Sequence, residues 1–107
     1  MPDQYRAVVC RGFGAGDTRV EAVRRVPLQS HQVRVRLQAS GVNFPDVLIV
    51  RGKYQLKPEF PFVPGTEGAG VIVEVGADGG ANRVGSAVMV SMRTGAYAEE
   101  AVVASAP

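Results

Sequence analysis

Apolar and polar side chains alternate most regularly in the segment around residue 35. Valine, leucine or alanine occupies each odd position of residues 33–39, and Arg34, Arg36 and Gln38 occupy the even positions. Successive side chains of a β-strand point to opposite faces, so a period of two predicts a strand with one buried face. We therefore expect residues 33–39 to form a half-buried strand whose arginines face solvent.

Several other segments have the pattern of shorter strands. Residues 7–10 form a continuous apolar run, AVVC, which is typical of a strand buried on both faces. Alternation over residues 71–75 predicts another strand, and residues 19–26 predict a weaker one. Shorter candidates are residues 88–90 and 101–103, and segments rich in glycine and proline separate these strands as turns.

One segment carries the signals of a helix. Asn43 is a favoured N-cap residue, and Pro45 is tolerated in a first helical turn, where its missing N–H costs nothing. Asp46 in the same turn favours the positive end of the helix dipole. Gly52 can adopt the left-handed conformation that ends a helix. These signals predict a helix of about two turns over residues 44–51.

Composition and length fit one small globular domain. The 107 residues are 46% hydrophobic and 21% charged, and a chain of this size buries roughly two-thirds of its unfolded surface. The single cysteine, Cys10, excludes a disulfide framework, and its apolar strand predicts an inert core residue. A mainly β chain with one short helix predicts a small, partly open barrel.

Charge and hydropathy narrow the range of binding partners that the sequence predicts. The net charge is +2, and Arg24 with Arg25 is the only adjacent basic pair, so the clustering typical of nucleic-acid binding is missing. No apolar run is long enough to span a bilayer, and no signal-peptide pattern follows Met1. We expect a cytoplasmic protein that binds neither nucleic acid nor membrane.

Two glycine clusters invite comparison with phosphate-binding loops. The dinucleotide fingerprint G-x-G-x-x-G joins a strand to the N-terminus of a helix. Residues 12–16 have three glycines, but Asp17 occupies the position of the third fingerprint glycine. A strand, not a helix, follows Gly65, Gly68 and Gly70. We interpret these glycines as turn residues and points of close backbone approach.

Two longer motifs are specific. They are ASGVNFPD at residues 39–46 and FVPGTEGAGVIVEVG at residues 62–76, with Gly52-Lys53-Tyr54 between them and GAYAE at residues 95–99. This arrangement resembles the quinone-oxidoreductase (zeta-crystallin-like) branch of the medium-chain dehydrogenase/reductase superfamily. The resemblance implies that residues 1–107 form a GroES-like catalytic domain. It also implies a longer, homodimeric parent enzyme in which a Rossmann domain, absent from this chain, binds NADPH.

The departures from the zinc-dependent members concern metal binding. Asn43 stands where those members have a cysteine, and Thr66 stands where they have a histidine. An amide and a hydroxyl are poor replacements for the ligands that zinc prefers. We therefore expect no bound metal. The chemistry that the resemblance implies is hydride transfer from NADPH to a quinone or an α,β-unsaturated carbonyl.

The resemblance also implies site residues. Asn43 would lie beside the nicotinamide, and Asn43 and Tyr54 would donate hydrogen bonds to the substrate oxygen that gains charge. Asp46 would orient the site by accepting from the hydroxyl of Thr66, which would itself contact the cofactor. Each residue also has a purely structural interpretation. Asn43 suits a helix cap, Tyr54 an amphipathic surface aromatic, and Asp46 a helix-dipole carboxylate.

Two other functions share this pattern. An enoyl-thioester reductase of the same superfamily would have the same barrel. The sequence of this domain therefore does not distinguish quinone or enone reduction from enoyl-thioester reduction. A non-enzymatic barrel resembling a co-chaperonin needs a mobile apolar loop, whereas residues 60–63 are framed by proline and predict a stiff segment. We expect the isolated chain to be inactive, because it lacks a fingerprint to hold NADPH.

Overall fold

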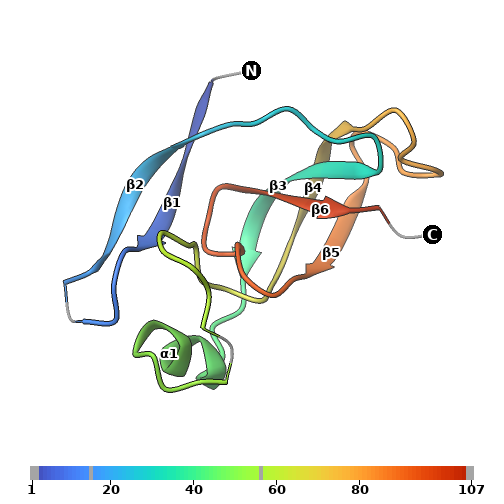
Figure 1. Cartoon of the computed structure of the whole chain (residues 1–107). Coiled ribbons are helices and arrows are strands. Elements are labelled where there is room, and N and C mark those ends of the chain that lie inside the picture. Colours follow the sequence, from blue (N-terminus) through green and yellow to red (C-terminus); the bar gives the residue numbers. More distant parts are fainter. Residues whose placement is uncertain (1–2, 15, 56, 106–107) are drawn as a thin grey trace.

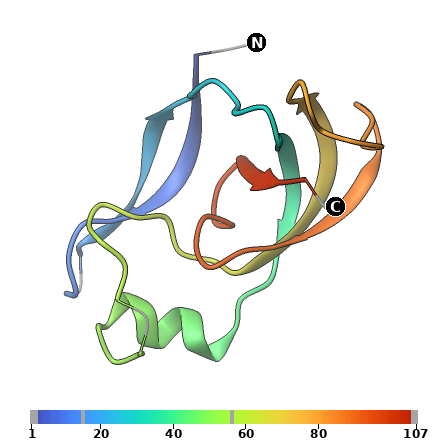
Figure 2. The ribbon, with the colours of Figure 1, turned by 45° about the vertical axis from the view of Figure 1, so that its right-hand side comes forward.

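The computed structural model describes residues 3–14, 16–55 and 57–105. Two antiparallel sheets make up the fold (Figure 1). One is the β1–β2 hairpin, and the other has the strand order β5-β4-β3-β6. Helix α1 lies at one end of both sheets (Figures 1 and 2). The elements are β1 (Gln4–Cys10), β2 (Thr18–Arg24), β3 (Gln32–Ser40), α1 (Phe44–Val50), β4 (Glu67–Val75), β5 (Ala87–Ser91) and β6 (Glu100–Ala104).

Single bridges join the hairpin to the rest of the chain. Ala7 of β1 pairs with Ala98, and Cys10 pairs with Phe62, each as an isolated antiparallel bridge. The sheets therefore stay open and do not close into a continuous barrel (Figure 2). This confirms the predicted fold class, a mainly β, partly open barrel with one short helix.

Two apolar clusters form the core. Between the long strands, Val33, Val35 and Ile72 are buried, and valines of β5 and β6 pack against them. A second cluster, here called the helix cluster, joins β1 and α1 to residues of the segment between α1 and β4. It consists of buried Cys10, Ile49 and Phe62 with the half-buried Val50 and Tyr54. The helix is thus held by its Ile49 face, and Cys10 is a core residue as predicted.

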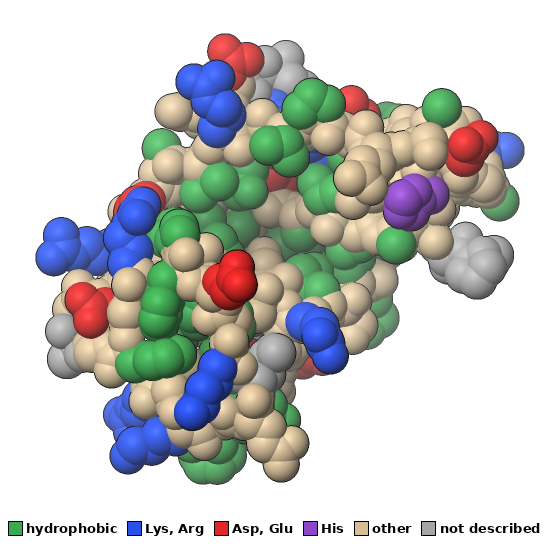
Figure 3. Space-filling model, in the orientation of Figure 1, with side chains coloured by type: hydrophobic (Ala, Val, Ile, Leu, Met, Phe, Trp, Pro, Cys, Tyr) green, Lys and Arg blue, Asp and Glu red, His purple; other side chains and the backbone are tan. Residues whose placement is uncertain are grey.

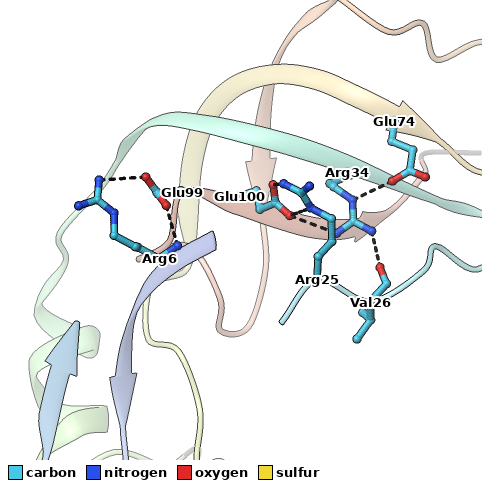
Figure 4. Close-up of polar contacts among 7 residues, drawn as sticks. All are labelled: Arg6, Arg25, Val26, Arg34, Glu74, Glu99 and Glu100. Atoms are coloured by element: carbon cyan, nitrogen blue, oxygen red, sulfur yellow. Dashed lines mark hydrogen bonds and ion pairs between the residues drawn. The ribbon is translucent and has the colours of Figure 1, made fainter. Parts of the chain in front are cut away.

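The predicted exposure of Arg34 is wrong. Its side chain is only 2% exposed, and its Nε donates to Glu74 across the β3–β4 pair at 2.8 Å (Figure 4). A second nitrogen, Nη1, lies 3.3 Å from Glu100 of β6. The carbonyl of Val26 accepts from Nη2, and Arg25 pairs with Glu100 as well. The segment after β2 therefore covers β3 at Arg34, whereas Arg36 and Gln38, the other polar positions of the alternation, are exposed as predicted.

Candidate active site

Helix α1 begins and ends as the sequence predicts. Asn43 has extended backbone angles, φ −121° and ψ 157°, and occupies the N-cap. Its backbone N–H donates to Oδ2 of Asp46 at 2.8 Å, while its carbonyl accepts from the N–H of Asp46 at 3.0 Å. Gly52, with φ +69°, follows Arg51 at the C-terminal end. These signals are local in sequence, so the pattern located the helix to within one residue.

Asp46 is the most enclosed polar group at this end of the helix. The residue is 2% exposed, and its Oδ2 accepts a second hydrogen bond from the hydroxyl of Tyr97 at 2.9 Å. Its Oδ1 is buried and has no partner among the described residues. The predicted pairing of Asp46 with the hydroxyl of Thr66 is therefore wrong. Tyr97 supplies the hydroxyl, and Thr66 contributes its carbonyl to the N–H of Met92 at 2.8 Å.

The side chain of Asn43 points to the start of β4. Its Nδ2 donates to Oε1 of Glu67 at 3.1 Å. The Glu67 carboxylate lies directly over Gly41, where a Cβ would collide with it. Glycine at position 41 thus lets Glu67 approach Asn43. We call Asn43, Asp46, Glu67 and Tyr97 the N-cap cluster, since their hydrogen bonds all meet at the first turn of α1.

Tyr54 belongs to a different contact set. Its half-buried ring packs against the helix cluster. The ring of Phe13 occupies the space that a Cβ on Gly52, two residues before Tyr54, would need. Phe13 in turn meets Phe60 edge-to-face with ring centroids 4.6 Å apart. The structure thus brings Asn43 and Asp46 together and places Tyr54 against the helix cluster, outside their hydrogen bonds.

Two surface grooves flank the end of β3, and the N-cap cluster contributes to both. One groove, of about 420 Å³, runs between β1 and β3 and is lined in part by Tyr97. The other, of about 490 Å³, lies over β3, β4 and β5 and is lined in part by Gly41 and Glu67. Hydrophobic side chains reach the surface near α1 and in the centre of the face shown in Figure 3. Both grooves therefore border residues of the N-cap cluster.

The hydroxyl of Tyr97 gives a measurable pH dependence. Burial and the hydrogen bond to Asp46 raise the pKa of Tyr97 from 10.0 to about 12. A tyrosine that ionises in the unfolded state but not in the folded state favours unfolding between these values. We expect the free energy of unfolding to fall as the pH rises from about 10 to about 12, and Tyr97→Phe to remove that component. Urea unfolding at a pH below and a pH above this range measures the loss. Equal losses of stability in the unmodified protein and in Tyr97→Phe would contradict the prediction.

Comparison with known proteins places the fold in a family. Residues 29–106 match the alcohol dehydrogenase GroES-like domain. The chain belongs to this family. The match confirms the predicted resemblance to medium-chain dehydrogenases/reductases.

The relatives of this GroES-like domain are much longer proteins. It is 43% identical over 100 residues to a quinone oxidoreductase-like protein 2 homolog of Nematostella vectensis, covering 92% of this chain and 27% of the relative. Identity to a synaptic vesicle membrane protein VAT-1 homolog of Mus musculus is 39% over 111 residues, covering 94% and 26%. A solved structure of a probable oxidoreductase from Mycobacterium abscessus superposes with a TM-score of 0.87 at 35% identity, covering 97% and 33%. The chain thus spans about a quarter to a third of the length of these proteins.

The GroES-like domain offers few metal ligands. The described residues include no group of three or more histidine, cysteine, aspartate or glutamate side chains placed to hold a metal ion. Within the same residues, no helix is long and apolar enough to cross a membrane. The polar side-chain groups of the N-cap cluster are an amide, two carboxylates and a phenol.

Sequence reasoning assigned no role to Tyr97. The residue lies in the GAYAE segment, which contributed to the family resemblance only as a motif. Tyr97 and Asp46 are separated by 51 positions, so no local pattern joins them. The available signal was indirect: a buried carboxylate needs hydrogen-bond donors, and the motif supplies a phenol.

Proposed function

We propose that this domain is the catalytic part of a longer, zinc-independent oxidoreductase that reduces quinones or α,β-unsaturated carbonyls with NADPH. The observation that carries the proposal is the fixed amide of Asn43 at the N-cap of α1, in a domain similar to quinone oxidoreductase-like proteins. The carbonyl oxygen of such a substrate gains negative charge when its carbon accepts hydride. A preorganised amide N–H favours that charge.

Asn43 has the hydrogen-bonding capacity for this role. A carboxamide carries two N–H donors, and one of them is directed to Glu67 at 3.1 Å. The other N–H remains for a substrate oxygen or the nicotinamide carboxamide. Asn43 and Thr66 are the residues of this chain that we assign to contact with the nicotinamide end of NADPH. When bound, NADPH supplies the hydride, and the protein supplies orientation and hydrogen bonds.

Zinc does not fit the same positions. Asn43 is engaged with Glu67 through its Nδ2, and Thr66 offers only a hydroxyl side chain. Neither side chain provides the thiolate or imidazole that zinc prefers. We therefore derive no step through a metal ion.

Purified protein is expected to contain far less than one zinc per chain. Elemental analysis after growth in zinc-supplemented medium, with no chelator in the buffers, measures this content. The Asn43→Cys, Thr66→His double variant, which restores the ligand types of the zinc-dependent members, is the comparison. Stoichiometric zinc in the unmodified protein would overturn the zinc-independent mechanism.

The function is tested on the full-length protein that contains this domain. Oxidation of NADPH is followed at saturating cofactor with a quinone, an enone and an enoyl thioester in parallel. The proposal expects turnover with a quinone or an enone. Turnover with the enoyl thioester alone would assign the protein to thioester reduction, and no turnover with any of the three would refute the enzymatic proposal.

The isolated 107 residues are expected not to bind NADPH with micromolar affinity. The described residues provide the Asn43 amide, but no strand–turn–helix unit with the dinucleotide fingerprint. Fluorescence titration of the chain with NADPH should show no saturation in the micromolar range, while the full-length protein should saturate. Saturable micromolar binding to the isolated chain would reveal a cofactor site within this domain.

A further inference from the structure

The backbone of Tyr97 is hydrogen-bonded to β1 and to Pro64, and not to helix α1. Its backbone N–H donates to the carbonyl of Pro64 at 2.9 Å, and its carbonyl accepts from the N–H of Val8 in β1 at 2.8 Å. Its ring lies against Gly65, whose φ of +101° and close contacts exclude a side chain. The hydroxyl of Tyr97 is therefore held in place through β1 and the Pro64–Gly65 segment.

From that fixed position the hydroxyl reaches the first turn of the helix. It donates to Oδ2 of Asp46, and this oxygen also accepts from the backbone N–H of Asn43. The other carboxylate oxygen, Oδ1, is buried without a partner among the described residues. Asp46 thus depends on two donors through one oxygen, and loss of either would leave a buried charge poorly compensated.

We infer that Tyr97 is a positioning residue for Asn43 and acts through Asp46. The inference rests on the proposed function for its catalytic consequence, but not for its structural content. Asp46 holds the backbone of Asn43, and Glu67 holds its amide, so a shift of Asp46 changes where the free amide N–H points. A tyrosine phenol is protonated, and therefore able to donate, at any pH near neutrality, and the raised pKa of Tyr97 extends this range upward.

The matched variants are Tyr97→Phe and Tyr5→Phe. Tyr5 is also a half-buried tyrosine with a raised pKa, caused mainly by burial, but it lies in β1 opposite Val23 and outside the N-cap cluster. Each change removes one hydroxyl and keeps the ring. In the full-length protein, we expect Tyr97→Phe to lower kcat by about tenfold with KM changed less than about twofold, because a small misplacement of a reacting group reduces turnover strongly. Tyr5→Phe should leave both constants unchanged.

A spectroscopic measurement separates this inference from the proposed function. In protein labelled with 15N at asparagine, the side-chain amide signals of Asn43 are identified by their loss in Asn43→Asp. Tyr97→Phe should shift these signals, whereas Tyr5→Phe should not. Unchanged Asn43 signals in Tyr97→Phe would overturn the inference, even if the protein proved to be a thioester reductase or no enzyme at all.

A double-variant cycle tests the route through Asp46. If Tyr97 acts only through that carboxylate, adding Tyr97→Phe to Asp46→Ala should change kcat less than about twofold. If the reductions of kcat by the two single variants multiply in the double variant, Tyr97 acts independently of Asp46. That outcome would contradict a positioning role through Asp46. Melting curves accompany each variant, and if Asp46→Ala does not fold, the amide signals of Asn43 decide the question.

Discussion

Changing Glu100 to glutamine is expected to lower the free energy of unfolding by about 3–5 kcal/mol. Glu100 is only 5% exposed and pairs with two arginines, Arg25 and Arg34. Glutamine keeps the shape but removes the charge, which leaves the fully buried Arg34 with the half-exposed Glu74 as its remaining anion. The penalty arises mainly from a buried guanidinium that has lost part of its compensation, not from the lost attraction itself.

A neighbouring residue provides the control for this prediction. Glu99 pairs with Arg6, but both side chains are largely exposed, and such pairs contribute little to stability. Thermal unfolding should show a fall in the melting temperature of at least about 12 °C for Glu100→Gln and almost none for Glu99→Gln. Equal melting temperatures for the two variants would contradict the prediction, because they would show that Arg34 stays compensated without the charge of Glu100.

The network also shows where the sequence pattern misleads. Alternation correctly predicted β3 and its buried valines, but it assigned Arg34 to solvent. A period of two separates the two faces of a strand without showing what covers each face. Here the chain after β2 reaches Arg34: the carbonyl of Val26 accepts from the Arg34 guanidinium, and Arg25 pairs with Glu100. Such coverage is a property of the tertiary fold.

Strand length was also underestimated where glycine interrupts the pattern. The alternation predicted a strand over residues 71–75, whereas β4 begins at Glu67. Gly70 lies within β4, and the backbone of Arg36 comes so close that a Cβ would collide with its carbonyl. Glycine commonly indicates a turn, but here it permits close approach of two strands, one of the roles that the sequence left open.

In the candidate site, too, the local contacts were predictable from the sequence and the long-range contacts were not. The cap and the first turn of α1 were predictable, because Asn43 and Asp46 interact over three positions. The partners that arrive from distant segments, Glu67 and Tyr97, were not. Family resemblance suggested that Thr66 would serve Asp46, and the structure replaces it with Tyr97. The roles of Asn43, Tyr54 and Thr66 in catalysis and cofactor contact remain predictions.

Turnover of the full-length enzyme is expected to fall about a hundredfold when Tyr54 is changed to phenylalanine. The prediction assumes that its hydroxyl donates to the substrate oxygen that gains charge. The substitution isolates that hydroxyl well, because the ring packs against Cys10, Ile49 and Phe62, and phenylalanine preserves this apolar contact. A catalytic hydroxyl therefore predicts a large loss of kcat with little change in stability.

The alternative for Tyr54 is a purely packing role, which predicts a different result. If the ring only forms a wall of the substrate site, Tyr54→Phe should reduce kcat by less than about tenfold, because the apolar body of the side chain is unchanged. The companion variant Asn43→Ala removes the second proposed donor and also the hydrogen bond of its side chain to Glu67, so the stability of this variant can change as well. Its kcat must therefore be compared at a temperature well below its own melting point. A kcat for Tyr54→Phe within a factor of two of the unmodified enzyme, with the best quinone or enone, would remove Tyr54 from the catalytic residues and leave Asn43 as the main donor.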